Sequence, residues 1–263
     1  MPLIDLPPRD RLFYVDENRP AERAVLLMHG LGANTASWQL QIPELVQRGY
    51  RVIAVDAPGF GQSPYSGRHW SISGSAALIH QLLASLGINH LDVVGISMGG
   101  TMALQLTLDF PHHVKRLVLV NTFARLQLAS PLVLPYFALR FLLVHTLGLP
   151  VQARQVAKRL FPLPEQEPLR QALIEQILQA DPRAYRAAMR ALARFNVYQR
   201  LPEIQAPTLV ITGERDTTVP PANQHVLAAG IRAARQVTVP AAGHAVTVEK
   251  PAEFNHLLID FLQ

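Results

Sequence analysis

The stretch of sequence that decides the fold covers residues 91–100 and reads LDVVGISMGG. Its first six residues, Leu91 to Ile96, are mainly apolar, which is typical of a strand buried on both faces of a parallel sheet. A helical pattern begins at Gly99 and continues to residue 110. Ser97 therefore lies on a turn between a strand and a helix, with glycines two residues away on either side. Such a turn holds the backbone in an unfavourable conformation and points the hydroxyl clear of the chain, so the pattern predicts a serine nucleophile.

Five other short apolar runs indicate further buried parallel strands on either side of this stretch. They cover residues 24–28, 52–55, 117–120, 208–212 and 236–239. Helical patterns lie between them, at residues 38–48, 73–86, 99–110, 221–229 and 252–262. Alternation of strand and helix predicts an α/β fold, a sandwich of three layers. The first 22 residues, with a short strand at residues 12–15, are expected to supply an antiparallel edge.

The alternation is interrupted once, between residues 122 and 200, where no strand pattern occurs. Four helical segments with proline-marked breaks fill this region, near residues 131–147, 151–160, 165–179 and 182–198. An insertion of this length between two strands predicts a cap over the carboxyl edge of the sheet, where open α/β sheets bind ligands. We therefore expect a core made of residues 1–121 and 201–263, and an all-helical cap, or lid, made of residues 122–200.

The composition excludes several classes of protein. A chain of 263 residues that is 49% hydrophobic and 16% charged is typical of a globular protein. It has no cysteine, which excludes disulfides, thiolate nucleophiles and cysteine-ligated metals. The net charge is +5, and residues 122–200 alone hold eleven basic and four acidic residues. These basic residues are spaced singly along helical patterns, so we expect a solvated helix face and no nucleic acid partner.

Residues 126–151 are apolar enough to raise the question of a transmembrane helix. Arg140 and three prolines fall within them, whereas a spanning helix needs about 20 mostly apolar residues without a central charge. We therefore expect two amphipathic cap helices and no stable membrane insertion. The first residues, Met1 to Asp5, lack the basic and apolar segments of a signal peptide, so a cytoplasmic protein is expected.

A serine hydroxyl becomes a nucleophile at neutral pH only with the help of an adjacent base. Of the ten histidines, His244 is the one that follows the last predicted strand and precedes the terminal helix. Asp216, just after the strand at 208–212, is expected to orient the imidazole of His244. Glu214 is its nearest rival, and a role for Asp216 in the turn alone stays open. The chain order Ser97, Asp216, His244 is a known order of nucleophile, acid and base.

The negative oxygen that forms during acyl transfer also needs hydrogen-bond donors. The segment from His29 to Gly32 follows the strand at 24–28, and its glycines allow a backbone N–H to turn towards a substrate carbonyl. We expect the backbone N–H groups of Leu31 and Met98 to form this oxyanion hole. His29 and Asp56 are interpreted as structural residues. The glycine spacing matches no dinucleotide or phosphate fingerprint, and we expect neither a cofactor nor a metal.

These residues resemble the α/β-hydrolase superfamily. The resemblance covers roughly residues 24–120 and 207–262 and includes Trp38, the segment from Asp56 to Ser63, and Gly243-His244 followed by Glu249-Lys250-Pro251. The arrangement of the chain is similar to that of the small microbial carboxylesterases, enol-lactonases and cofactor-free perhydrolases with a helical lid. The resemblance implies a mostly parallel sheet of about eight strands. It implies a catalytic triad of Ser97, Asp216 and His244, with Leu31 and Met98 as the oxyanion hole.

The expected activity is that of a carboxylesterase, a serine hydrolase that cleaves carboxylic esters of apolar acyl groups through an acyl-enzyme on Ser97. Dehalogenases and epoxide hydrolases of the family have an aspartate nucleophile where this chain has Ser97, which disfavours those reactions. Carbon–carbon bond hydrolases usually have an asparagine where this chain has Ile96, which weakens that alternative. The apolar content of the cap predicts an acyl site that includes Leu132, Phe137, Phe141 and Leu142. The alternatives are a lactonase, thioesterase or perhydrolase with the same triad, and a ligand-binding protein with little or no turnover. The sequence indicates neither the oligomeric state nor the physiological substrate.

Overall fold

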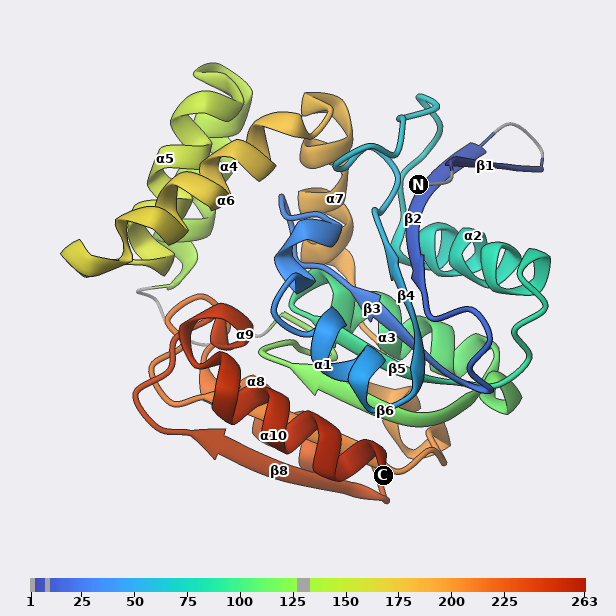
Figure 1. The fold of residues 1–263 in the computed structure, drawn as a ribbon. Helices are drawn as coiled ribbons and strands as arrows, with labels where there is room; N and C mark the ends of the chain where they lie inside the picture. The colour runs from blue at the N-terminus through green and yellow to red at the C-terminus, as the bar shows by residue number, and fades with distance from the viewer. Residues whose placement is uncertain (1–2, 8–9, 127–132) are drawn as a thin grey trace.

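The computed structural model describes residues 3–7, 10–126 and 133–263, and their strands form one sheet (Figure 1). Eight strands are found among these residues, in the order β1-β2-β4-β3-β5-β6-β7-β8. β1 and β2 are antiparallel to their neighbours, and the pairs from β4 to β8 are parallel. The strands are β1 Leu3–Leu6, β2 Asp10–Glu17, β3 Arg23–Met28, β4 Tyr50–Val55, β5 Leu91–Ile96, β6 Val114–Val120, β7 Thr208–Gly213 and β8 Ala234–Val239.

Helices cover both faces of this sheet, which confirms the predicted three-layer α/β fold. Because successive side chains of a strand point to opposite faces, each central strand contributes to two separate apolar cores. Leu26 of β3 packs in the core that includes α2 (Ile72–Ser85), α3 (Met98–Asp109) and α8 (Pro221–Gly230). Leu27, the next residue, packs in the other core, which includes α1 (Ile42–Gln47), α9 (Val246–Glu249) and α10 (Pro251–Leu262).

Four α-helices follow β6 and precede β7 in the described part of the chain. They are α4 Val133–Thr146, α5 Gly148–Leu160, α6 Glu167–Gln179 and α7 Pro182–Arg194. In Figure 1 α4, α5 and α6 lie together at one end of the molecule, apart from α2 and α10 on the sheet. The division into a core and a cap at residues 122 and 200 stays a prediction. Within the described residues, no helix combines the length and the apolar character needed to cross a bilayer.

The predicted elements differ from the structure at a few places. The expected helix at residues 38–48 is a 3₁₀ helix, η1 (Thr35–Trp38), followed by α1, which has Pro43 in its first turn. Proline has no N–H to donate, and in the interior of an α-helix it removes a hydrogen bond and kinks or breaks the helix, so Pro43 favours the first turn of a new helix. β1 and α9 were not predicted. The other 3₁₀ helices are η2 Pro111–His113, η3 Pro164–Gln166 and η4 Tyr198–Glu203.

Candidate active site

Ser97 lies at the end of β5 and caps the N-terminus of α3. Its backbone has φ 55° and ψ −115°, a conformation that residues other than glycine rarely adopt. A Cβ added at Gly95 would overlap the carbonyl of Gly99, and one added at Gly99 would overlap the carbonyl of Met28. The two glycines are therefore needed for the close approach of three backbone segments. This packing keeps the turn tight, as the sequence pattern predicts.

The structure brings Asp216 and His244 together. His244 Nδ1 lies 2.8 Å from Asp216 Oδ2, and both side chains are buried. The other carboxylate oxygen of Asp216 accepts hydrogen bonds from the backbone N–H groups of Thr218 and Val219, at 2.8 and 2.9 Å. An ionised Asp216 in this position favours a proton on His244 Nδ1, which leaves Nε2 as an acceptor. Glu214, the rival, is exposed and accepts a hydrogen bond from the Ala241 N–H instead.

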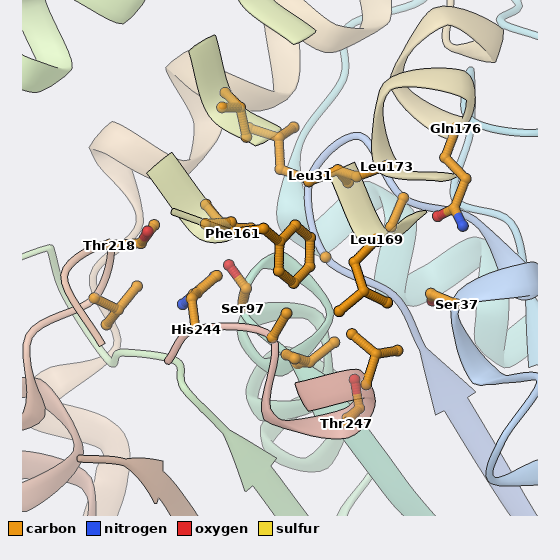
Figure 2. Close-up of a pocket in the computed structure, with 18 of the residues that line it drawn as sticks. Leu31, Ser37, Ser97, Phe161, Leu169, Leu173, Gln176, Thr218, His244 and Thr247 are labelled. Carbon is orange, nitrogen blue, oxygen red and sulfur yellow. The ribbon is translucent and has the colours of Figure 1, made fainter. Parts of the chain in front are cut away.

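One cavity of about 190 Å³ is lined by Ser97, His244 and Leu31 (Figure 2). Its lining is mostly apolar, and α5 and α6 contribute several side chains to it: Val156, Leu160, Leu169, Ala172 and Leu173. Among the described residues, the Ser97 hydroxyl makes no hydrogen bond with another side chain. Catalytic hydrogen bonds are often long in a free enzyme and tighten when substrate binds. The predicted nucleophile and the predicted base thus share one cavity beneath helices of residues 122–200.

The prediction of which cap residues line this cavity was partly wrong. Phe141 and Leu142 are 44% and 57% exposed and do not line it. They follow Arg140, which is buried and does line the cavity, so the adjoining positions of α4 turn towards solvent. Leu132 lies outside the described residues, and so does the side chain of Phe137.

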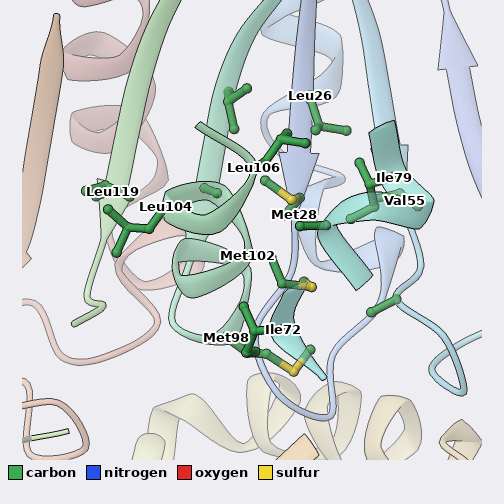
Figure 3. Close-up of a cluster of buried hydrophobic side chains, with 14 of the residues drawn as sticks. Leu26, Met28, Val55, Ile72, Ile79, Met98, Met102, Leu104, Leu106 and Leu119 are labelled. Carbon is green, nitrogen blue, oxygen red and sulfur yellow. The ribbon is translucent and has the colours of Figure 1, made fainter. Parts of the chain in front are cut away.

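Leu31 and Met98 occupy positions suited to donors for a negative oxygen. Leu31 lines the cavity, and Met98 is the first residue of α3, where N–H groups have no partner within the helix. Neither N–H donates to another described residue outside the helix. The Met98 side chain is buried in the core cluster with Met102 and Ile72, and Figure 3 shows the three side chains near one another. The partial positive charge at this helix end also favours an anion.

His29 and Asp56 brace the loop that carries Leu31. His29 is fully buried, and its Nε2 accepts a hydrogen bond from the Ala57 N–H at 3.0 Å. Burial lowers the pKa of His29, which favours the neutral imidazole that can accept this bond. Asp56 accepts hydrogen bonds from the backbone N–H groups of Thr35 and Gln62, at 2.7 and 2.8 Å. Neither side chain lines the cavity, in agreement with a structural role.

Asn121, which the sequence analysis did not single out, connects three loops of the site. Its Nδ2 donates to the carbonyls of Gly243 and His244, at 3.0 and 2.8 Å. Its Oδ1 accepts from the Gly213 N–H at 2.8 Å, three residues before Asp216. The residue is fully buried and has φ 44°, a value that asparagine tolerates better than most residues. A polar residue directly after the buried strand at 117–120 was the signal for it.

Thr122, the next residue, connects the same point to the nucleophile. Its Oγ1 donates to the Ser97 carbonyl at 2.7 Å, and the Ser97 N–H donates to the Val120 carbonyl at 2.9 Å. The end of β6 is therefore hydrogen-bonded to the loops that hold Ser97 and His244, and through Gly213 to the segment that leads to Asp216.

Glu249 holds the loop of His244 from the other side. Its two carboxylate oxygens accept hydrogen bonds from the N–H groups of Gly243 and Ala245, at 3.0 and 2.9 Å. These two residues flank His244 in the sequence. Burial raises the pKa of Glu249, and the two hydrogen bonds and the nearby His244 oppose that effect. In the sequence, Glu249 stands out only as part of the family motif Glu249-Lys250-Pro251.

Three comparisons relate the chain to known proteins. A model of the alpha/beta hydrolase fold family matches residues 23–251. A RutD protein of Variovorax paradoxus (strain S110), whose name provisionally assigns it to carbamate hydrolysis, is 34% identical over 250 residues, 92% of this chain and 93% of the relative. An enol-lactonase structure from Burkholderia xenovorans LB400 has a TM-score of 0.89 at 25% identity and covers 99% of both chains. A thermophilic esterase structure from Thermogutta terrifontis has a TM-score of 0.86 at 25% identity and covers 100% of this chain and 98% of its own.

Proposed function

The chain belongs to the α/β-hydrolase fold family, and we propose that it is a serine hydrolase that cleaves carboxylic esters through an acyl-enzyme on Ser97. The proposal assigns His244 as the general base and Asp216 as the carboxylate that orients it. The observation that carries it is the hydrogen bond of 2.8 Å between Asp216 and His244, at the cavity that Ser97 also lines. The strained backbone of Ser97 supports the proposal further. Such a conformation costs free energy, and strained residues cluster at active sites, where the turn exposes the nucleophile.

The proposed reaction is acyl transfer in two halves. The Ser97 oxygen attacks the ester carbonyl carbon while His244 Nε2 takes the hydroxyl proton, and the carbonyl electron pair moves to its oxygen. The N–H groups of Leu31 and Met98 stabilise that oxygen. The carbonyl re-forms as the alcohol leaves with the proton from His244. Water then repeats these steps on the acyl-enzyme and releases the acid and Ser97.

We further propose that residues 122–200 act as a cap that shapes the acyl site. Leu160, Leu169 and Leu173 come from α5 and α6 and line the cavity on the side that the cap provides. Apolar side chains exclude water from an acyl-enzyme and favour an apolar acyl chain. The cytoplasmic location and the absence of a nucleic acid partner stay predictions from the sequence.

Carbamate hydrolysis is a second candidate, and the 34% identity with the RutD protein favours it. A carbamate has the same kind of carbonyl carbon as an ester, with nitrogen attached, so the same serine and histidine would act on it. Lactone hydrolysis is a third option, because the enol-lactonase has a closely similar fold. All three reactions use the same groups and differ only in the substrate that fits the cavity.

The function is tested by pre-steady-state kinetics on the intact chain. With p-nitrophenyl butyrate we expect a rapid burst of about one p-nitrophenolate per active site, followed by slower turnover, because the acyl-enzyme accumulates. Ser97→Ala is expected to lose both phases. Wild-type rates on matched ester, lactone, thioester and carbamate substrates then rank the reactions. If the wild type turns over none of these substrates, the ligand-binding alternative replaces the proposal.

A further inference from the structure

Neutral polar side chains line the cavity in addition to Ser97 and His244. Among the described residues they are Ser37, Gln39, Gln176, Thr218 and Thr247. Gln39 is exposed, and the Ser37 hydroxyl donates a hydrogen bond of 2.7 Å to the Asn34 carbonyl. The other three side chains are at least partly buried. An apolar acyl chain by itself leaves these three polar groups without a role in the reaction.

Gln176 and Thr247 have polar groups that no other part of the described chain pairs. Gln176, on α6, has a buried Oε1 that accepts no hydrogen bond. Thr247, on α9, is only 4% exposed. Its backbone carbonyl accepts a hydrogen bond from Gln41 Nε2 at 3.0 Å, whereas its hydroxyl makes none with another described residue. A buried polar group without a partner costs free energy, so a molecule bound in the cavity gains by pairing with it.

The position of these residues relative to Ser97 indicates which part of an ester they face. The alcohol leaves on the side of His244, because this residue donates a proton to the leaving oxygen. In Figure 2, His244 and Thr218 lie on one side of Ser97. Gln176 and Thr247 lie on the other side. The acyl chain extends away from the leaving oxygen, so Gln176 and Thr247 face the acyl part of a bound ester.

The two side chains reach the cavity from different directions, and Leu169 lies between them in the view of Figure 2. A trans secondary amide points its N–H and its C=O in opposite directions. The N–H can donate to Gln176 Oε1, and the C=O can accept from the Thr247 hydroxyl. The last torsion of a glutamine side chain is broad, so the amide of Gln176 can turn its acceptor towards a bound group. Leu169 and Leu173 line the same part of the cavity and suit the carbon chain beside the amide.

We propose that the substrates are esters whose acyl chain contains a secondary amide, and that Gln176 binds its N–H while Thr247 binds its C=O. This inference rests on the proposed ester hydrolysis and adds the substrate class to it. In the reaction the ester C–O bond breaks, water supplies the hydroxyl of the new acid group, and the alcohol leaves with a proton. The amide bond is unchanged, so the product is an N-acylated amino acid.

The test compares three series of ethyl esters that differ in one group. The first series is the ethyl esters of N-butanoyl-glycine, N-butanoyl-β-alanine and N-butanoyl-4-aminobutanoate, in which the amide moves away from the ester by one carbon at a time. The second series replaces the amide N–H with a methylene group and is a ketone. The third replaces the whole amide with two methylene groups and is a hydrocarbon chain. Released ethanol is measured. For the best chain length, we expect the wild-type kcat/KM on the amide to exceed that on the ketone by about tenfold or more, because the ketone leaves Gln176 Oε1 unpaired.

Two variants of similar shape assign each hydrogen bond to its residue. Gln176→Met removes the acceptor for the N–H, so the ratio of kcat/KM for amide to ketone is expected to fall about tenfold. Thr247→Val removes the donor to the C=O, so the ratio for ketone to hydrocarbon is expected to fall about tenfold. Thr247→Val should keep the ratio for amide to ketone, because both of these substrates have the carbonyl.

The matched controls are Gln171→Met and Thr107→Val. Gln171 is an exposed residue of α6, and Thr107 is a buried residue of α3 whose hydroxyl donates to the Ala103 carbonyl at 2.8 Å. Neither residue lines the cavity, so both variants should keep the wild-type ratios. Turnover of the hydrocarbon ester by each variant shows that its fold and its Ser97 are intact.

The inference and the proposed function fail in different ways. The inference is overturned if the wild type prefers no amide over its ketone at any chain length, or if either Gln176→Met or Thr247→Val keeps both wild-type ratios. In each of these cases, Ser97-dependent turnover of the hydrocarbon ester would leave the proposed function standing. If the wild type hydrolyses none of the three series, the proposed function itself fails.

Discussion

At the scale of single residues, the candidate site depends on how its reactive groups are held. The Asp216 carboxylate has one oxygen fixed by two backbone N–H groups and the other directed at His244. This arrangement selects the tautomer of His244 in which Nε2 can accept a proton. Glu249 fixes the backbone on either side of the same histidine. His244 is thus held both at its imidazole ring and at the backbone on either side of it.

Asp216→Asn is expected to lower kcat/KM for an ester by about 10³- to 10⁴-fold. An amide NH₂ facing His244 Nδ1 favours the opposite tautomer, whose Nε2 carries a proton and cannot accept one from Ser97. The control is Glu214→Gln, which alters an exposed carboxylate in the same loop and should leave kcat/KM within about threefold, as surface substitutions have small effects. A loss of less than tenfold in Asp216→Asn would contradict the role assigned to Asp216.

Glu249→Gln is expected to change how stability depends on pH. Burial raises the pKa of Glu249 above its ordinary value of 4.5, and the hydrogen bonds from the N–H groups of Gly243 and Ala245 oppose that rise. Protonated Glu249 therefore contributes to the free energy of unfolding. This contribution is fully present below the pKa of Glu249 in the unfolded chain, and it is lost as the pH rises through the raised pKa of the folded protein. Glutamine does not titrate. The Tm of the wild type minus that of the variant should fall as pH rises from 4 to 8, and a difference that stays flat or grows would count against this account.

At the scale of elements, the carboxyl ends of the parallel strands bring distant segments together. β5 delivers Ser97, β7 leads to Asp216, and β8 leads to His244. β6 lies between β5 and β7 in the sheet, and its end supplies the contacts that join these loops. Asn121 and Thr122 make those contacts in two consecutive residues. The geometry of the site is therefore a property of four neighbouring strand ends.

Asn121→Asp is expected to impair both stability and turnover. The substitution keeps an acceptor for the Gly213 N–H and a side chain that tolerates positive φ, but it leaves the carbonyls of Gly243 and His244 without a donor. Each buried group left unpaired costs about 1–3 kcal/mol of unfolding free energy. We expect kcat to fall by about tenfold or more with a smaller change in KM, because His244 is displaced while the cavity walls remain.

Asn18→Asp is the matched control for this variant. Asn18 also has a positive φ, 56°, and its Nδ2 donates to a backbone carbonyl, that of Tyr50, at 3.1 Å. The bond lies between the strand β4 and the turn after β2, away from the cavity. Denaturant unfolding should show a loss of stability in both variants, whereas kcat should fall only in Asn121→Asp. Equal kcat values for the two variants would remove the positioning role of Asn121.

At the scale of the whole molecule, strands buried on both faces were the most predictable part of the fold. β5 was predicted at its observed bounds, because its six residues are all buried and its sequence is mainly apolar. β1 is a short edge strand with exposed residues, so its sequence has no such signal. The phase of α4 was not predictable, since Leu139, Phe141 and Leu142 are apolar and nonetheless exposed. Apolar residues on a helix do not reveal which face packs inward when several faces are apolar.

The candidate site was predictable as a set of residue types in chain order, and less so as a structure. Ser97, Asp216 and His244 each follow a strand, which is a pattern visible in sequence. Asn121 was missed because its partners are the carbonyls of residues more than a hundred positions away, and only the sheet order brings them together. In the sequence, Arg140 is only a charge that argues against a membrane helix at residues 126–151. Its place in the cavity depends on how α4 packs.

The most direct test of the central claim is a crystal structure of the protein after reaction with a p-nitrophenyl alkylphosphonate. The proposed mechanism predicts a covalent bond between phosphorus and the Ser97 oxygen, with the phosphoryl oxygen within hydrogen-bond distance of the Leu31 and Met98 N–H groups. It also predicts His244 Nε2 within hydrogen-bond distance of the Ser97 oxygen or of a second oxygen on phosphorus. A fully active reagent that leaves Ser97 unmodified, or an adduct whose phosphoryl oxygen points away from both amides, would contradict it.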